Sequence, residues 1–390
     1  MEFPQLQSCC DFDPAAELEA VLLRVPARWV VYLFADADDR PIQLLCVKNL
    51  RASLRRRLGP PPENEPSRRV DYRQLVRRVY WRRVDSHFEA DLLYLELARQ
   101  LFPDSYEQIV AFRPAWFLHI DIDAPFPRYV KTETPATQSG QLFGPLEHKA
   151  DAQKLIEQLE DWFDLCRYHN ILAQAPHGRA CAYKEMGRCP APCDGTVSME
   201  QYRRLIQLSA AALADPADFV RGHERRMQQA AGALKFEAAA KIKQYVDSLS
   251  QLGAGPFRHV RPLDDLRFIT LQRGPGPRSA KVFLITPTAV RAIACLLDTP
   301  QPGAGVVQLG LTEDRTRQPM DRIAIETLGV VARHLFAEKP SGAFSPGAFI
   351  PLDQFNEESA AKAYRDIVKQ KLSDETEDEG IVRELQSVEP

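Results

Sequence analysis

The chain has 390 residues, 45% of them hydrophobic, and a formal net charge of −3 at pH 7. This length predicts two or three domains, and the weak negative charge excludes a protein that is uniformly basic and coats nucleic acid. No segment has the charged start, apolar run and cleavage site of a secretory signal, or the roughly 18 apolar residues of a bilayer span, so we expect a cytoplasmic protein with no membrane association.

The first hundred residues predict a small domain in which a β-hairpin leads into a basic helix. Residues 29–34 and 41–47 are rich in β-branched and aromatic side chains, and the polar run between them supplies a turn. A helix is expected over residues 49–58, because a glycine and three prolines follow it directly.

Positive charge is concentrated in this first region. Between residues 48 and 83 the sequence holds twelve Lys and Arg residues against three acidic ones. Contacts with a phosphate backbone need only positive charge in the right place, so we predict a surface that binds DNA. The alternative is a solvated face with no ligand. The candidate DNA-binding residues are Lys48, Arg51, Arg55 and Arg56.

Four cysteines fall within 28 residues in the middle of the chain, with the spacing C-x14-C-x7-C-x3-C. Strands are predicted at 115–121 and 126–132, and a helix from about residue 146 to 165 leads to the first cysteine. Grouped thiolates bind zinc or an iron–sulfur cluster, and this spacing differs from that of a zinc ribbon. The alternative is four buried, reduced thiols. The candidate ligands are Cys166, Cys181, Cys189 and Cys193.

A helical hairpin is expected over residues 215–254, after a helix that begins with a capping box at Ser198. Apolar side chains recur every three or four residues from Ala231 to Leu252 and form one stripe. Two helices bury little apolar surface by themselves, so the stripe is expected to meet a second hairpin. The alternative is packing against the hairpin's own chain.

Residues 255–372 predict a small α+β domain, and residues 373–390 an acidic tail. Strands are expected at 267–272, 280–285 and 289–295 in an antiparallel sheet, followed by helices at 322–336 and 356–372. Three side chains of chemical interest are interpreted as two solvated turn carboxylates and an ordinary helix histidine. They are Asp264, Asp265 and His334.

The cysteine segment from Arg179 to Tyr202 closely resembles that of UvrC, the nuclease subunit of bacterial nucleotide excision repair. This resemblance implies a 4Fe-4S cluster on the four cysteines, with zinc as the alternative. Residues 227–243 resemble the UVR motif, by which UvrC pairs with a similar hairpin of UvrB. A UvrB-like partner is therefore expected at this hairpin. The residues implied in that contact are Leu234, Phe236, Glu237 and Ile242.

The hairpin and basic helix at the start of the chain resemble the GIY-YIG nuclease domain of UvrC. Such nucleases use tyrosines, a lysine, an arginine and a glutamate that binds Mg2+. Tyr32 matches the first tyrosine, and Lys48-Asn49-Leu50 matches a family motif that fixes the register. That register places Ser53 at the arginine position. Residues 88–103 resemble a second family helix, and the ungapped match places Tyr94 at the glutamate position, whereas a two-residue slip would place Glu96 there. The head therefore resembles a nuclease fold whose catalytic residues are replaced.

Together these patterns predict an α+β protein that is non-catalytic and associated with DNA repair. One alternative is an active single-incision nuclease like the Cho branch of the family, in which Tyr32 survives and Glu96 binds Mg2+. Another is a cluster-bearing regulator unrelated to repair. The expected units are a degenerate GIY-YIG-like head (1–107), a Cys-cluster domain (108–214), a UVR helical hairpin (215–254), a small C-terminal α+β domain (255–372) and the acidic tail (373–390).

Overall fold

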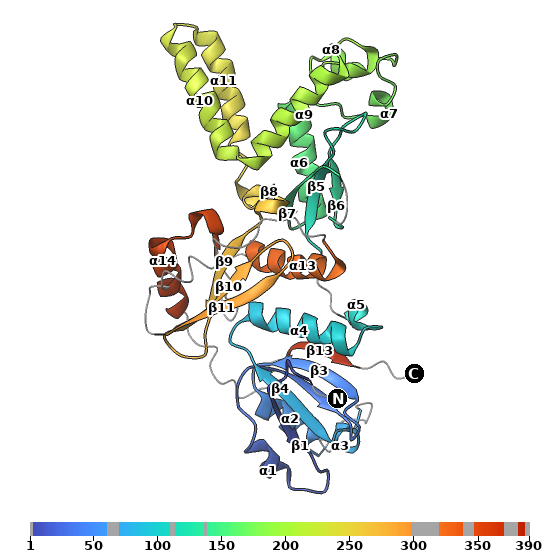
Figure 1. Ribbon diagram of the computed structural model, residues 1–390, viewed down its shortest axis with the longest axis vertical. Coiled ribbons are helices and arrows are strands. Elements are labelled where there is room, and N and C mark those ends of the chain that lie inside the picture. The colour runs from blue at the N-terminus through green and yellow to red at the C-terminus, as the bar shows by residue number, and fades with distance from the viewer. Residues whose placement is uncertain are drawn as a thin grey trace.

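The computed structural model describes residues 3–60, 70–109, 114–135, 139–297, 320–337, 347–369 and 381–386. These residues form an elongated molecule with the head at one end, the C-terminal domain in the middle and two diverging arms at the other end (Figure 1). Helices and strands are mixed throughout, which confirms the α+β class. No helix in the described part of the chain is long and apolar enough to cross a bilayer.

The head is built on a five-stranded antiparallel sheet with helices on both faces. Strand β2 lies near its centre and is buried along its whole length, because both of its faces are covered. Helices α1 (Leu18–Leu22), α2 (Leu50–Leu58) and α3 (Tyr72–Leu75) cover one face, and α4 (His87–Leu101) covers the other, followed by α5 (Tyr106–Ile109). In sheet order the strands are β1 (Ser8–Asp11), β4 (Arg78–Arg83), β2 (Val30–Ala35), β3 (Pro41–Val47) and β13 (Ile381–Gln386).

Strand β13 differs from the expectation for the end of the chain. It lies within the predicted acidic tail, but it pairs antiparallel with β3, from Ile381 opposite Val47 to Gln386 opposite Gln43. The acidic run 374–379 itself lies outside the described residues. An exposed sheet edge offers unpaired backbone groups, and pairing with β13 satisfies those of β3. A strand contributed from more than three hundred residues away leaves no local signal in the sequence.

The middle of the chain forms a second antiparallel sheet, with α6 (Lys149–Trp162) packed against it. This helix was expected from about residue 146, directly after residues 142–145, but those residues belong to strand β7 and α6 begins only at Lys149. Close packing explains the difference, because a Cβ at Gly144 would lie 2.4 Å from the Phe117 ring. In sheet order the strands are β6 (Val130–Thr132), β5 (Trp116–Ile120), β7 (Gln141–Leu146) and β8 (Arg261–Pro262).

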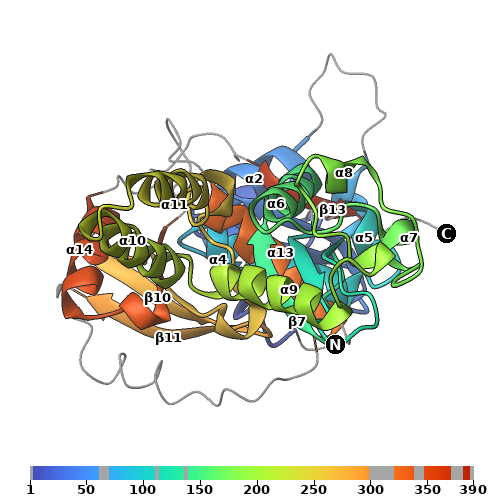
Figure 2. The ribbon, with the colours of Figure 1, turned by 90° about the horizontal axis from the view of Figure 1, so that it is seen from above.

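Two arms extend from this sheet. One carries the cysteines on short helices between α6 and α9 (Met199–Ala214), and α9 starts with the predicted capping box at Ser198. The other is a hairpin of α10 (Pro216–Gly232) and α11 (Phe236–Leu249). Seen from above, the hairpin and the cysteine arm lie on opposite sides of the molecule (Figure 2). The short cysteine-arm helices are α7 (His169–Leu172), α8 (Ala182–Glu185) and η1 (Pro192–Asp194).

The C-terminal domain is a four-stranded antiparallel sheet between two helices. Helix α13 (Arg322–Phe336) covers one face and α14 (Glu357–Val368), capped by Asn356, covers the other. The short 3-10 turns η2 (Gly255–Phe257) and η3 (Leu263–Asp265) precede this sheet, and η4 (Leu352–Gln354) follows its last strand. In sheet order the strands are β11 (Val290–Leu297), β10 (Ser279–Ile285), β9 (Phe268–Arg273) and β12 (Ala348–Pro351).

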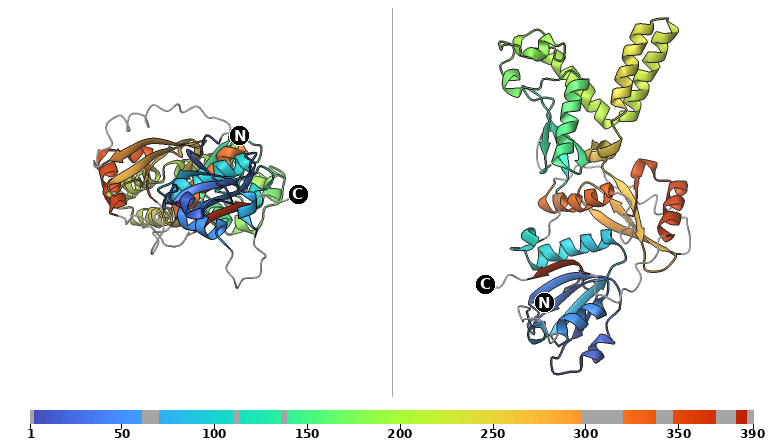
Figure 3. Two further views of the ribbon diagram at one scale, coloured as in Figure 1. Left: turned by 90° about the horizontal axis from the view of Figure 1, so that it is seen from below. Right: turned by 180° about the vertical axis from the view of Figure 1, so that it is seen from behind.

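Helix α13 also lies against helix α4 of the head, so the two domains are not independent (Figure 3). Polar contacts line this boundary, which we call the head seam. Lys281 of β10 places its Nζ 2.8 Å from Asp85 Oδ2 and 2.7 Å from Glu89 Oε1. Nearby, Nε2 of the buried His334 lies 3.0 Å from the carboxylate of Asp91, which is also buried. The head is thus fixed to the C-terminal domain by charged groups that are largely withdrawn from water.

Candidate functional site

The cysteine arm holds its thiols in a compact loop beyond helix α6. The backbone N–H of Cys166 donates to the buried hydroxyl of Tyr202 on α9, at 3.1 Å. The backbone N–H of Gly178 donates to the carbonyl of Cys193 at 2.8 Å, and a Cβ at Gly178 would meet that carbonyl at 3.0 Å. These bonds tie Cys166 to α9 and the loop around Cys193 to the segment at Gly178. All eight cysteines of the chain are free thiols.

Three of the four predicted ligands interact with one another. Cys166, Cys189 and Cys193 are buried, and a hydrogen bond joins the sulfur atoms of Cys166 and Cys189. That bond lowers the pKa of Cys189, which accepts it, and raises the pKa of Cys166. The charge of Cys193 also raises the pKa of Cys166, and the charge of Cys189 raises the pKa of Cys193. A lowered thiol pKa favours the thiolate, which is the form that binds metals.

The fourth predicted ligand, Cys181, differs from the other three in its exposure. It is partly exposed at the start of α8 and borders a hollow of about 650 Å³, together with Lys184 and Asp194. Lys184 Nζ lies 2.6 Å from Asp194 Oδ2, and this bond lowers the pKa of Asp194 to about 2. Among the described residues, no three His, Cys, Asp or Glu side chains are arranged to hold a metal ion. The sulfur donors suit a thiolate-bound metal chemically, but the four cysteines would have to rearrange to hold one.

The hairpin presents large apolar side chains at its tip. Leu234 is 74% exposed and Phe236 is 65% exposed, whereas most large apolar residues of the chain are buried. Glu237 is also exposed, and Ile242 is half-buried farther down α11. The four residues predicted to contact a partner therefore lie on the outer half of the hairpin, and three of them are accessible.

Leu234 occupies a backbone conformation that normally favours glycine. Its φ is +59°, and α10 ends in a Schellman motif in which Leu234 N–H donates to Ala231 and Lys235 N–H donates to Ala230, both at 2.9 Å. A left-handed conformation costs an L-residue about 1–2 kcal/mol that glycine does not lose. The exposed leucine side chain therefore does not stabilise this turn.

The head brings together two of its expected nuclease positions. The Tyr32 hydroxyl lies 2.8 Å from Ser53 Oγ, and both side chains are fully buried between the sheet and α2. The serine thus occupies the place predicted for a catalytic arginine, directly beside the tyrosine. Tyr94, at the position predicted for the metal-binding glutamate, is also buried and its hydroxyl donates to the Leu44 carbonyl at 3.4 Å. No carboxylate stands at that position.

The alternative pair, Tyr32 and Glu96, is not brought together. Tyr32 belongs to the core between the sheet and α2, whereas α4 packs on the opposite face of the sheet. Glu96 is exposed on α4, where its Oε1 accepts from Gln5 at 3.5 Å. A fully buried phenol on one face and an exposed carboxylate beyond the other cannot act on the same phosphate.

Two of the four predicted DNA-binding residues are engaged inside the head. Arg51 donates to the carbonyls of Leu22 and Val25 at the end of α1, at 2.9 and 3.0 Å. Arg55 pairs with Glu19 at 3.3 Å. Arg56 is exposed and Lys48 is half-buried. The basic surface of the head is therefore smaller than the charge count predicts.

No local pattern indicates the buried contact between Asp91 and His334. Their separation of 243 residues explains this, since each lies on an otherwise ordinary amphipathic helix. Arg333 also reaches the same Asp91 oxygen, at 3.4 Å. The interpretation of His334 as an ordinary helix histidine is thus incomplete, because the residue links two domains.

Comparison with known proteins finds a family that matches the region of the cysteine arm. Residues 115–212 match the family model for the middle domain of UvrC/Cho excinucleases, and this range includes all four predicted ligands. The chain is 26% identical to UvrABC system protein C of Trichlorobacter lovleyi over 60% of its own length and 38% of that protein. It is 25% identical to the same protein of Rickettsia felis, over 68% of this chain and 41% of the relative.

A shorter stretch matches UvrABC system protein C of Desulforudis audaxviator with 32% identity. It covers 35% of this chain and 22% of that relative. The chain thus spans about two fifths or less of the length of these curated relatives. No solved structure gives a significant match.

Proposed function

We propose that this UvrC-like chain is a non-catalytic protein of nucleotide excision repair that carries a metal cluster and binds a UvrB-like partner through its hairpin. The observation that carries the proposal is the match over residues 115–212, because it contains the whole sulfur set. The cluster would be 4Fe-4S, held by Cys166, Cys189 and Cys193 with Cys181 as the fourth ligand, and zinc is the alternative. Such a cluster would join α6, α8 and η1 and thereby stabilise the arm.

The absence of catalysis in the proposal rests on the chemistry of the head. Phosphodiester hydrolysis needs positive charge to neutralise the phosphate in the transition state, and a carboxylate to hold Mg2+. Ser53 is neutral, Tyr94 supplies a phenol in place of the carboxylate, and Tyr32 is shielded from solvent. Loss of one such transition-state group costs about 10²–10³ in rate, and this head lacks at least two.

We therefore expect no Mg2+-dependent incision of a lesion-bearing or nicked duplex by the full chain. The measurement is an end-labelled cleavage assay with and without EDTA, in which an intact UvrC with its UvrA and UvrB partners serves as the positive control. Incision that disappears in both Tyr32→Phe and Glu96→Gln would establish the active-nuclease alternative and refute the non-catalytic proposal.

The partner-binding part of the proposal rests on the hairpin tip. A large apolar residue held in a left-handed turn costs folding free energy, so its presence favours a role in contact with another molecule. Leu234 and Phe236 would be anchors in an apolar pocket between partner helices, and Glu237 would lie at the polar rim. Ile242 would extend the apolar contact down α11.

Leu234→Gly is expected to separate binding from folding. The substitution relieves the left-handed strain, so the thermal midpoint of the chain should stay the same or rise. Affinity for a UvrB C-terminal hairpin should nevertheless fall at least about tenfold, as it should for Phe236→Ala. Calorimetric titration of the hairpin into each variant measures this change.

Leu208→Ala is the matched control, because Leu208 is 49% exposed on α9 and lies outside the hairpin. Its affinity should equal that of the wild type. If Leu234→Gly and Phe236→Ala bind as tightly as Leu208→Ala, the hairpin tip is not the partner surface.

DNA contact remains part of the proposal, on a reduced surface. Lys48 lies just before α2, and Arg56 lies in its last turn. Both carry positive charge that could contact a phosphate. Arg51 and Arg55 are assigned instead to the packing of α1 against α2.

A further inference from the structure

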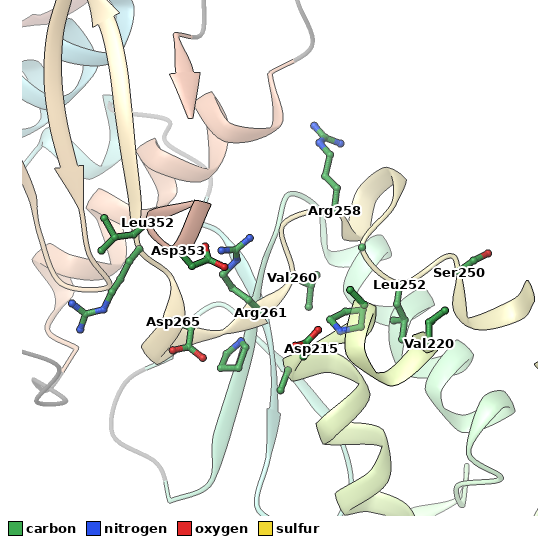
Figure 4. Close-up of a pocket in the computed structure, with 16 residues that line it drawn as sticks. Asp215, Val220, Ser250, Leu252, Arg258, Val260, Arg261, Asp265, Leu352 and Asp353 are labelled. Carbon is green, nitrogen blue, oxygen red and sulfur yellow. The ribbon is translucent and has the colours of Figure 1, made fainter. Parts of the chain in front are cut away.

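A pocket of about 670 Å³ opens where the hairpin arm, the middle sheet and the C-terminal domain meet (Figure 4). Its walls come from the turn between α9 and α10, the segment that follows α11, strand β8 and the η4 turn. Sites for small molecules and cofactors have volumes of roughly 300–1,000 Å³, so this pocket is large enough for a drug-sized ligand. The proposed partner, cluster and DNA surface all lie elsewhere in the molecule.

One end of the pocket is apolar. Val220 of α10, Leu252 and Val260 line this end, and Pro216 adds to it near the start of α10. Leu252 and Val260 each expose only 7% of their surface, because their other sides belong to the core of the middle domain. This end therefore offers fixed apolar walls to the body of a ligand.

The other end of the pocket is charged and holds an arginine with an unused donor. The Arg261 guanidinium lies 4.8 Å above the Phe268 ring, which fixes its plane. Its Nε is buried and has no hydrogen-bond partner among the described residues. Asp353 and Asp265 attract Arg261 electrostatically, and Figure 4 shows Asp353 beside it. A buried donor without an acceptor is destabilising, and a ligand acceptor would recover that loss.

The charges that line the pocket limit the class of ligand. Three arginines and three aspartates line it, so the pocket has no excess of charge to attract a polyanion or a polycation. Arg258 is committed to the carbonyls of Gly255 and Phe336 and leads away from the pocket. At the polar end, the planar guanidinium of Arg261 thus lies beside carboxylates. This end offers hydrogen-bond donors and acceptors next to each other.

A nucleobase has the complementary features. Its edge carries ring acceptors beside exocyclic amino donors, and its flat faces are apolar enough to pack against aliphatic side chains. Arginine pairs with such acceptors and aspartate accepts from such amino groups in known base recognition. A free amino acid has the same charge balance, but it is too small to reach both ends of the pocket.

We infer that this pocket binds one unpaired nucleobase, with Arg261 donating to a ring acceptor, Asp353 accepting from an amino group, and Val220 and Leu252 packing on the ring. The base can belong to a free mononucleotide or to a single strand of nucleic acid. Both sources present the same edge to the pocket.

Calorimetric titrations of the full chain with each of the four nucleoside monophosphates, and with a short single strand, test this inference. We expect at least one of these ligands to bind. Arg261→Gln and Asp353→Asn should each weaken that binding by about tenfold or more. Binding of the mononucleotide indicates a free nucleotide site, and binding of the strand alone indicates capture of a base from nucleic acid.

Two further variants complete the test. Arg204→Gln removes an arginine that is 68% exposed and pairs with Glu200 on α9, so it should bind like the wild type. Val220→Trp fills the apolar end without touching the charged end and should abolish binding, even if the charged variants prove unstable. The inference is wrong if no mononucleotide or strand binds, or if binding survives in Val220→Trp, Arg261→Gln and Asp353→Asn. The affinity of these variants for the UvrB C-terminal hairpin should stay unchanged. Failure of the nucleobase inference can therefore be distinguished from failure of the proposed function.

Discussion

Cys189→Ser should deprive this protein of its iron and acid-labile sulfide when it is prepared without oxygen, whereas the wild type should carry both and be brown. Cys189 accepts the hydrogen bond from Cys166 and has a lowered pKa, so it is the thiol of the set best prepared to bind as a thiolate. A serine hydroxyl does not ionise in the same range and is a poor ligand for iron. Iron and sulfide per chain, together with the visible absorption spectrum, measure the effect.

Cys295→Ser is the matched control, because Cys295 is exposed on β11 and lies outside the cysteine arm. Its iron content should equal that of the wild type. A wild-type chain that holds one zinc and no iron would favour the zinc alternative, and a chain with neither metal would refute the cluster. Cys181→Ser is informative in its own right. If it keeps the full metal content, the fourth ligand is not Cys181.

Local patterns predicted the elements whose folding depends on neighbouring residues. Helix α13 was expected over 322–336 and has those bounds, because Asp321 caps its first turn and its apolar face is continuous. Strand β3 was likewise predicted at 41–47 and found there. Failures occurred where a distant contact decides the conformation. Gly144 lies in a strand because the Phe117 ring needs the space, and β13 exists because β3 has an open edge.

The candidate sites also differ in whether a local sequence pattern or only a distant contact indicates them. A short motif fixed the register that placed Ser53 at the arginine position, and the contact of Ser53 with Tyr32 became visible only in the structure. The spacing showed the four cysteines as a group, but it did not show that Cys181 is partly exposed while the other three are buried. The nucleobase pocket had no local signal, since its lining residues run from Ala214 to Asp353 and meet only in the folded chain. The spacing of residues in the sequence can identify ligands that one segment supplies. A pocket between domains forms only when the domains pack together, so residue spacing does not indicate it.

The head seam gives rise to the second prediction of large effect, which concerns Lys281. Burial alone lowers the pKa of Lys281, but the charges of Glu89 and Asp85 outweigh burial and raise the pKa above its ordinary value. A raised lysine pKa means that the stabilisation is fully present below the ordinary pKa of about 10.4, and is lost as the pH rises through the higher folded value. At neutral pH the ion pairs of Lys281 therefore contribute fully to folding.

Lys281→Met should lower the free energy of unfolding at pH 7 by about 3 kcal/mol, because it leaves the buried carboxylate of Glu89 without its cation, while Asp85 keeps only Arg83. Urea unfolding followed by the fluorescence of Trp29 and Trp81, both buried in the head, measures the change. The matched control is Arg204→Met, which breaks an exposed pair on α9 and should leave the midpoint unchanged. Equal midpoints for the two variants would mean that the head and the C-terminal domain do not stabilise each other through this lysine. A large difference would instead show that the folding of the head depends on the domain that follows the hairpin.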